Sequence, residues 1–270
     1  MSDHLFRHLA PISDAGWSAI EDDVKPRLEV QLAGRKLVDF TGPAGWEHSA
    51  TNLGRSQAIA GPAADITAAQ RLVLPLVEIR AAFALSRREL EDLERGARVV
   101  EFAALDDAAH RFALAENQAV FHGYPAAGIT GIVQASGQDP IPLDADPNRY
   151  PVAVARAVDV LRNSGIGGPY GIAIAPALYT EIAETAEHGG YPLFDHLREI
   201  LGGPVVWTPG VECGVVVSQR GGDFVFDSGE DISIGYTSHD ADAVHLYLEE
   251  SYTFRVLEPN AGVTLQSPSS

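Results

Sequence analysis

Residues 42–64 read GPAGWEHSATNLGRSQAIAGPAA, a stretch rich in Gly, Ala, Ser, Asn and Pro with little hydrophobic periodicity. The segment that follows, residues 72–85, is largely apolar and contains Pro75. Together they predict an extended excursion with weak strands. Loops of this length are uncommon inside a compact domain. We therefore expect the excursion to pack against something outside its own domain, such as a neighbouring subunit.

A helix is predicted before this excursion, between Ser13 and Ala33. Apolar side chains recur there every three or four residues, which places one stripe on a helical face: Trp17, Ile20, Val24, Leu28 and Leu32. Ser13 is suited to the N-cap and Gly34 to the stop. Pro26, inside the pattern, is expected to kink or divide the helix.

Two further helices are predicted after the excursion. Ser86 and Glu89 have the spacing of a capping box, and Gly96 ends the short helix that this box would begin. Its acidic side chains (Glu89, Glu91, Asp92 and Glu94) are interpreted as a solvated face. A longer helix is predicted from Ala104 to Phe121, ending at Gly123.

The second half of the chain predicts a small α/β layer followed by strands. A Gly-, Pro- and Asp-rich stretch at 128–147 marks the boundary. The expected helices run to Asn163 and over 177–186 and 193–201, and the strands span 170–175, 205–208, 214–218, 223–227 and 232–236. A final long strand, Ala243 to Leu257, alternates apolar and polar residues and is expected to carry a bulge near Glu250.

Composition narrows the class of protein. The 270 residues carry 37 acidic and 19 basic side chains, a net charge of −18, which disfavours binding to nucleic acid or to anionic membrane surfaces. Hydrophobic residues make up 46% of the chain, enough for a folded core. No window approaches the ~20 apolar residues of a spanning helix. The single cysteine, Cys213, fits a reducing cytoplasm.

Motifs for catalysis are weak throughout. Gly165, Gly167, Gly168 and Gly171 imitate a dinucleotide loop, but the last glycine comes one position late and the segment precedes a strand, so a turn is predicted. No serine lies in a Gly-x-Ser-x-Gly elbow. Cys213, in an apolar run, is interpreted as a small buried side chain. No catalytic residue is therefore assigned, and the protein is expected not to be an enzyme.

Metal-binding patterns are equally incomplete. Asp144 and Asp146 imitate a calcium loop, yet Arg149 and Ala155 occupy the positions of the required glycine and bidentate acid, which predicts a polar turn. His4 and His8 are four residues apart and could share an ion on one helical face. Nothing nearby in the sequence supplies a third and fourth ligand, so no metal site is expected.

Seven short strings, in order along the chain, carry a family resemblance: 9–11 (LAP), 34–39 (GRKLVD), 93–96 (LERG), 167–170 (GGPY), 188–192 (HGGYP), 220–224 (RGGDF) and 233–236 (SIGY). In this order they resemble the encapsulin shell proteins, also catalogued as linocin-type bacteriocins. Each string alone is weak, but the likeness spans essentially the whole chain.

The resemblance implies an α+β fold of the HK97-type phage capsid, assembling into a closed icosahedral compartment. Mapped on this chain, residues 1–44, 83–133 and 220–270 would form the peripheral domain. Residues 45–82 would form the extended loop and residues 134–219 the axial domain. Such a loop is ordered by neighbouring subunits, and assembly offsets the entropy of fixing it.

Encapsulins enclose a cargo enzyme, commonly a dye-decolourising peroxidase or a ferritin-like iron oxidase, through a short peptide at the cargo's C-terminus. The resemblance implies that this peptide docks on the following positions: Leu28, Leu32, Arg35, Asp39, Asp231, Ile234 and Tyr236. Apolar anchors would fill a groove, with Arg35 and Asp39 setting the orientation. The competing interpretation keeps Leu28, Ile234 and Tyr236 in the core and pairs Arg35 with a local acid.

The resemblance also implies a loop at the fivefold opening, formed by Glu187, His188, Gly189, Gly190 and Tyr191. His188 would make that opening sensitive to pH, and acidic side chains lining pores are hypothesised to attract cations such as iron. Some encapsulins stack flavin on a tryptophan at the position of Arg88. Flavin is therefore possible here but not expected, and no cofactor is predicted.

Two other function classes compete with a shell subunit in the bacterial cytoplasm. A protease or bacteriocin is one, since proteins of this type have carried that label, but a catalytic constellation is missing from the sequence. A phage capsid subunit that packages DNA is the other. The charge of −18, repeated around a closed shell, disfavours that alternative.

Overall fold

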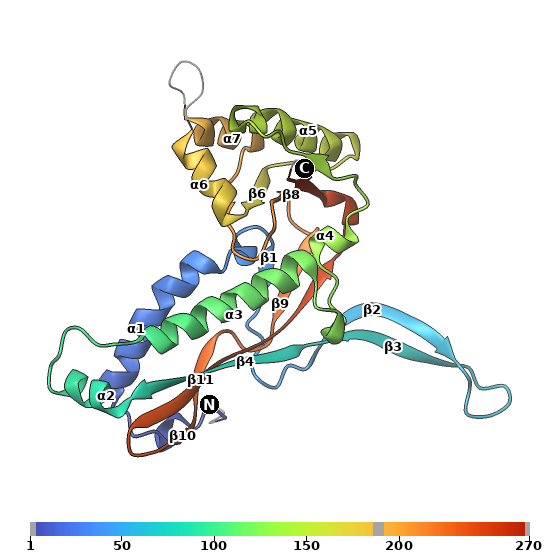
Figure 1. Ribbon diagram of the computed structural model, residues 1–270. Helices are drawn as coiled ribbons and strands as arrows, with labels where there is room; N and C mark the ends of the chain where they lie inside the picture. Colours follow the sequence, from blue (N-terminus) through green and yellow to red (C-terminus); the bar gives the residue numbers. More distant parts are fainter. Residues whose placement is uncertain (1–3, 186–191, 268–270) are drawn as a thin grey trace.

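The computed structural model describes residues 4–185 and 192–267. Two sheets with their helices lie one above the other, and a long hairpin projects to one side (Figure 1). Among helices in the described ranges, none has both the length and the apolarity needed to cross a bilayer.

The first sheet is built around one long strand, β11 (Ala243–Val256). This strand pairs antiparallel with β10 (Ser233–His239), β4 (Val77–Ser86) and β9 (Phe224–Ser228), while β1 (Asp39–Thr41) runs parallel to β9. The register of β11 against β4 is unbroken from Ala243 to Tyr252. The predicted bulge near Glu250 is therefore wrong. The irregularity lies in β10, between Tyr236 and Ser238.

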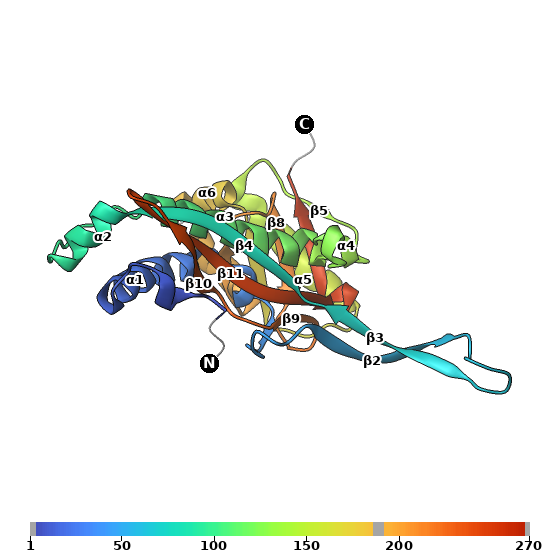
Figure 2. The same cartoon turned by 90° about the horizontal axis from the view of Figure 1, so that it is seen from below.

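Two helices, α1 (Asp14–Gln31) and α3 (Ala103–His122), pack side by side on this sheet (Figures 1 and 2). The predicted stripe on α1 is confirmed, because Trp17, Ile20, Val24 and Leu28 are buried against Phe112 and the sheet. Oγ of Ser13 accepts from the Gly16 N–H at 3.2 Å, as expected of an N-cap. The helix continues through Pro26, whose ring lies on the exposed side, so the chain is not divided there.

The short helix α2 (Arg87–Glu94) forms where it was predicted, but the capping box does not. The side chain of Ser86 makes no capping hydrogen bond, and Glu89 instead accepts from the backbone N–H of Glu101 at 3.1 Å. The carboxylate reaches a loop that the sequence spacing does not anticipate. Helix α3 ends at Gly123 as expected, with φ +81° and backbone atoms too close to admit a side chain.

The excursion folds as a projecting antiparallel hairpin of β2 (Ala50–Ile59) and β3 (Ala68–Pro75), which in the described part of the chain pair only with each other (Figure 2). Both strands are largely exposed. The hairpin is shorter than the predicted loop of residues 45–82, because residues 77–86 leave it and pair with β11 as β4.

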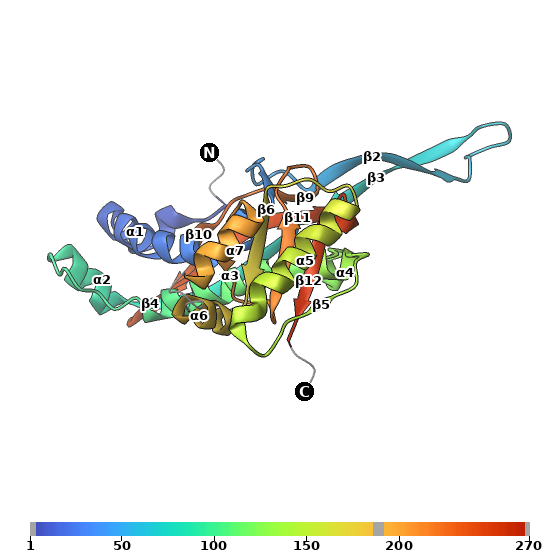
Figure 3. The ribbon, with the colours of Figure 1, turned by 90° about the horizontal axis from the view of Figure 1, so that it is seen from above.

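The second sheet has the strand order β5 (Ile141–Pro142), β12 (Gly262–Gln266), β8 (Gly214–Ser218), β6 (Tyr170–Ile174) and β7 (Val205–Trp207). Helices α5 (Tyr150–Asn163) and α7 (Leu193–Leu201) lie side by side over it, with α6 (Pro176–Glu184) beside α7 (Figure 3). The predicted elements of this layer are confirmed within a few residues. Cys213 is buried, and burial raises its pKa.

The position of strand β12 differs from the predicted division of the chain into domains. That division groups residues 220–270 with the first sheet, whereas β12 pairs with β8 in the second. The remaining elements are short: α4 (Ile132–Ala135), η1 (Arg7–Leu9), η2 (Gly34–Lys36), η3 (Pro125–Ala127), η4 (Pro147–Arg149) and η5 (Pro259–Ala261). Asp146 caps η4 by accepting from the Asn148 N–H, which confirms a polar turn there.

Candidate functional site

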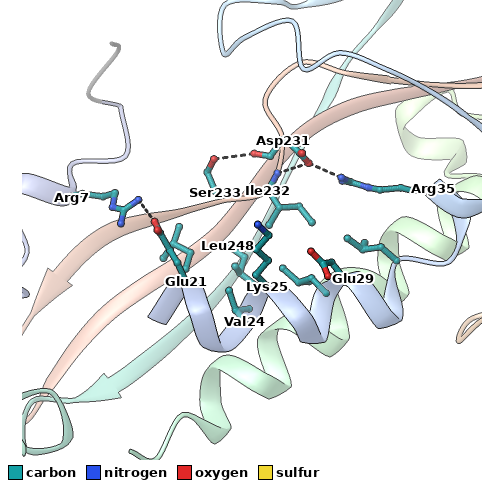
Figure 4. A pocket seen from close by; sticks show the side chains of 13 residues that line it. Arg7, Glu21, Val24, Lys25, Glu29, Arg35, Asp231, Ile232, Ser233 and Leu248 are labelled. Carbon is teal, nitrogen blue, oxygen red and sulfur yellow. Dashed lines mark hydrogen bonds and ion pairs between the residues drawn. The ribbon is translucent and has the colours of Figure 1, made fainter. Parts of the chain in front are cut away.

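A cavity of about 420 Å³ lies between α1 and strands β10 and β11 (Figure 4), and we call it the α1–β10 groove. Its apolar lining comes from both sides: Val24 and Leu28 from α1 with Leu32 at its C-cap, and Ile234 from β10 and Leu248 from β11 with Ile232 just before β10. A surface of this kind takes up apolar side chains from a ligand, since burying them removes their area from water.

Charged side chains of both signs surround these apolar residues. Arg7 pairs with Glu21 at 2.6 Å at one end, and Arg35 pairs with Asp231 at 2.6 Å at the other. Between these two pairs, Lys25 and Glu29 extend from α1 (Figure 4). The groove therefore combines an apolar centre with polar groups that can orient a bound chain.

Arg35 is anchored from inside the protein. Its Nε donates to Oε2 of Glu116 at 2.8 Å, and its Nη2 donates to Oε2 of Glu250 at 2.6 Å. Both glutamates are buried, whereas the Arg35 side chain is 16% exposed. The guanidinium also lies over the rings of Phe40 and Phe226. Arg35 thus presents one edge to the groove and keeps the rest inside.

The two buried carboxyl groups share a single cation. Burial raises the pKa of Glu116, and Arg35 opposes that rise. The pKa of Glu250 is raised well above its usual range, first by burial and then by the negative charge of Glu116. The arrangement favours a proton on Glu250, because two buried charges beside one guanidinium repel each other.

Asn117 fixes the backbone that carries Arg35. Its Oδ1 accepts from the N–H groups of Ala33 and Gly34, both at 3.0 Å, and its Nδ2 donates to Gln31 O at 2.8 Å and Pro209 O at 3.0 Å. The side chain is fully buried on α3. These four bonds satisfy the backbone at the end of α1 and set the start of η2.

Five of the seven positions predicted for cargo docking line this one groove: Leu28, Leu32, Arg35, Asp231 and Ile234. Asp39 does not. Its Oδ2 accepts from the Gly222 N–H at 2.5 Å, and it lines a different cavity with Leu37 and Gln219. Tyr236 packs against the hydrophobic core that includes Leu28 and Ile234, but its hydroxyl bonds Nδ1 of His239 at 2.6 Å. The docking role of all seven stays a prediction.

The sequence interpretation missed eight groove residues: Arg7, Glu21, Val24, Lys25, Glu29, Ile232, Ser233 and Leu248. Helical periodicity could have found half of them, because Val24 belongs to the buried stripe and Glu21, Lys25 and Glu29 repeat at every fourth position beside it. Arg7 carries no such signal, since it reaches the groove only through tertiary packing.

A group of potential metal ligands lies elsewhere. Within the described residues, His4, Glu230 and Glu249 form the one cluster of three whose ligand atoms lie within 4.8 Å of one another. The pairing of His4 with His8 considered from sequence is replaced by His4 with two distant glutamates. His8 lines a separate cavity with Trp17 and Asp14.

The profile of the family described as "Encapsulating protein for peroxidase" matches residues 2–253. A "Type 1 encapsulin shell protein" of Rhodospirillum rubrum is 46% identical, over 98% of this chain and 97% of that protein. The chain belongs to the encapsulin shell proteins. A type 1 encapsulin shell protein of Mycobacterium tuberculosis is 37% identical, over 97% of this chain and 98% of its own.

Solved structures confirm the α+β capsid fold of this encapsulin. A virus-like particle from Pyrococcus furiosus matches with a TM-score of 0.66 at 17% identity, covering 93% of this chain and 99% of that one. The Mycobacterium phage Bobi structure matches with a TM-score of 0.56 at 13% identity, covering 89% and 91%. At these identities the likeness shows the HK97-type fold alone.

Two predicted sites of this encapsulin remain predictions. The pore loop (Glu187, His188, Gly189, Gly190 and Tyr191) lies outside the described residues. Arg88, which the family resemblance relates to flavin stacking, is exposed on α2. The expectation that flavin does not bind is not tested by its position.

Proposed function

We propose that this shell protein assembles into a closed compartment and that its α1–β10 groove binds the C-terminal peptide of a cargo enzyme. The observation that carries the proposal is the groove itself, an apolar cavity with charges of both signs around it, lined by five of the positions that the family resemblance assigns to cargo. In this proposal the chain is structural and cytoplasmic, and the chemistry belongs to the cargo.

The projecting hairpin supports assembly. It forms a two-stranded sheet of its own, and isolated hairpins are marginally stable in water. Large apolar side chains on it are exposed: Ile59 at 51%, Ile66 at 54% and Val73 at 46%. A neighbouring subunit would bury these side chains and so order the hairpin.

The shape and chemistry of the groove support a peptide ligand. A volume of about 420 Å³ accommodates a few apolar side chains and is too small for a folded domain. Val24, Leu28 and Leu32 follow one another along α1 and its C-cap, so apolar anchors of an extended peptide can occupy successive positions beside them. A peroxidase is the first cargo to test, because the family description names peroxidase. A ferritin-like iron oxidase is the second.

Co-expression tests this proposal. A fluorescent protein that carries the C-terminal tail of a peroxidase from the same genome is expressed with the shell, and its content in purified particles is measured. Ile232→Asp introduces a charge into the groove and should lower loading at least ~10-fold while shells still form. Val30→Asp is the control, since Val30 is 61% exposed on α1 and does not line the groove. Equal loading of both variants would refute the docking role.

A further inference from the structure

We propose that His4, Glu230 and Glu249 bind a divalent first-row transition-metal ion, with zinc as the best match. His4 lies in the N-terminal segment, Glu230 between β9 and β10, and Glu249 in β11. One imidazole nitrogen and one carboxylate oxygen from each glutamate lie within 4.8 Å of one another. None of the three lines the α1–β10 groove, so this site is independent of cargo docking.

Glu249 provides the strongest indication of a missing positive partner. Its side chain is 1% exposed, and its Oε2 is paired with Nε of Arg80. Its other oxygen, Oε1, is buried and accepts no hydrogen bond among the described residues, although it lies 3.7 Å from Nε2 of His4. Buried carboxylate oxygens normally have a donor or a cation. An ion between Glu249 and His4 supplies that partner.

The spacing of the donors suits a tetrahedral ion after small movements. Zinc holds nitrogen and oxygen ligands at about 2.0–2.2 Å, which places two ligands roughly 3.3 Å apart. Nε2 of His4 now lies 2.6 Å from Oε2 of Glu230 and 3.7 Å from Oε1 of Glu249. The first pair would open by roughly 0.7 Å and the second would close by roughly 0.4 Å.

Surrounding contacts orient the ligands. The imidazole of His4 stacks on the indole of Trp46, with ring centroids 4.5 Å apart and planes 14° apart. The neighbouring Leu5 carbonyl accepts from the Tyr236 N–H at 2.8 Å, which holds the N-terminal segment beside β10. Arg80 holds Glu249 from the other side. Such outer contacts set the orientation and basicity of metal ligands.

The donor set narrows the identity of the ion. One imidazole nitrogen with two carboxylate oxygens disfavours magnesium and calcium, which prefer oxygen ligands throughout. This donor set suits zinc and the other divalent first-row transition metals, with water as the fourth ligand. Because the ligands come from three separate segments, the ion would tie the N-terminal segment to β11, and Trp46 extends that contact to the base of the hairpin.

The test uses assembled shells stripped with a chelator and then titrated with zinc chloride in a calorimeter. One zinc ion per subunit is expected, and cobalt(II) in its place should give visible absorption typical of a tetrahedral ion. His4→Ala should weaken zinc binding at least ~10-fold. The matched control is His8→Ala, on the same segment and outside the cluster, which should bind as the wild type does.

Glu230→Gln provides a second variant that keeps the shape of its side chain. It should lose zinc and cobalt binding to the same extent as His4→Ala, with shell assembly checked by sedimentation. Zinc uptake that is absent in the wild type, or unchanged in both His4→Ala and Glu230→Gln, overturns the proposal and leaves His4 and Glu230 as an ion pair only. Uptake lost equally in His8→Ala places the ion elsewhere and overturns it too.

Discussion

Nη2 of Arg35 lies 2.6 Å from Oε2 of Glu250, and the same nitrogen lies 2.6 Å from Oε2 of Glu116. The two glutamates are buried on different elements, α3 and β11, so one guanidinium joins a helix to the central strand of the sheet. The same side chain reaches Asp231 at the groove. The residue proposed to orient a cargo peptide is therefore also part of the interior of the subunit.

Removing the cation should destabilise the subunit strongly. Arg35→Met leaves two buried carboxyl groups without their partner, and we expect a loss of about 3–5 kcal/mol in the free energy of unfolding. Urea denaturation followed by tryptophan fluorescence measures it. Arg149→Met is the control, because Arg149 pairs with Asp144 at the surface and should contribute less than about 1 kcal/mol. Similar losses in the two variants would contradict an interior role for Arg35.

The stability of the subunit should fall as pH rises. The folded protein holds the Glu250 proton more tightly than the unfolded chain does, since its pKa is raised above the ordinary 4.5. The resulting stabilisation is present near pH 4.5 and is lost as pH rises through the raised pKa. Glu250→Gln should flatten this decline at pH values above 4.5.

Unfolding free energies at several pH values check this expectation. Glu94→Gln, on the exposed face of α2, is the matched control and should keep the slope of the wild type. If Glu250→Gln keeps that slope too, the decline arises from another group.

Losing the Asn117 amide should loosen the end of α1. Asn117→Ala removes all four of these bonds: the Ala33 N–H and the Gln31 carbonyl still pair with each other at 2.9 Å, whereas the Gly34 N–H and the Pro209 carbonyl lose their buried partner. We expect a loss of about 2–4 kcal/mol. Gln118→Ala, at the next and exposed position of α3, should change stability by less than about 0.5 kcal/mol. Thermal unfolding monitored by circular dichroism compares them, and equal melting temperatures would contradict the role of Asn117.

Shortening the hairpin should prevent assembly without unfolding the subunit. Among the described residues the hairpin pairs with no other strand, so replacing residues 53–72 with a tight turn removes no buried residue of either hydrophobic core. The variant should sediment slowly while its circular dichroism keeps the helical signal. Shells of normal size would show that the hairpin is dispensable for assembly.

Local signals predicted much of this fold. The apolar stripe from Trp17 to Leu28 located α1, and alternation along residues 243–257 located β11. The capping box predicted at Ser86 does not form, because the Glu89 carboxylate accepts a hydrogen bond from the Glu101 N–H instead. The bulge was placed in the wrong strand, since it depends on how β10 meets β11 and not on either strand alone.

The residues of the candidate site were likewise predicted from the sequence only in part. Resemblance to the family identified five groove residues, and periodicity along α1 pointed to Val24. Asp39 could not be excluded from sequence, because it follows Arg35 by only four residues. Its carboxylate nevertheless turns to Gly222. The position of the Asp39 carboxylate depends on the pairing of β1 with β9, and no local sequence pattern predicts that pairing.

The amino-acid sequence alone determined the longer helices, three strands of the second sheet (β6, β7 and β8), the excursion that became a hairpin and the encapsulin family. These follow from periodicity and motifs that span a few residues each. Only the tertiary structure decided that Arg35 joins Glu116 and Glu250, that His4 meets Glu230 and Glu249, and that β12 pairs with β8. The physical reason is separation, since Arg35 and Glu250 lie 215 residues apart and meet only when the hydrophobic cores around the two sheets have packed.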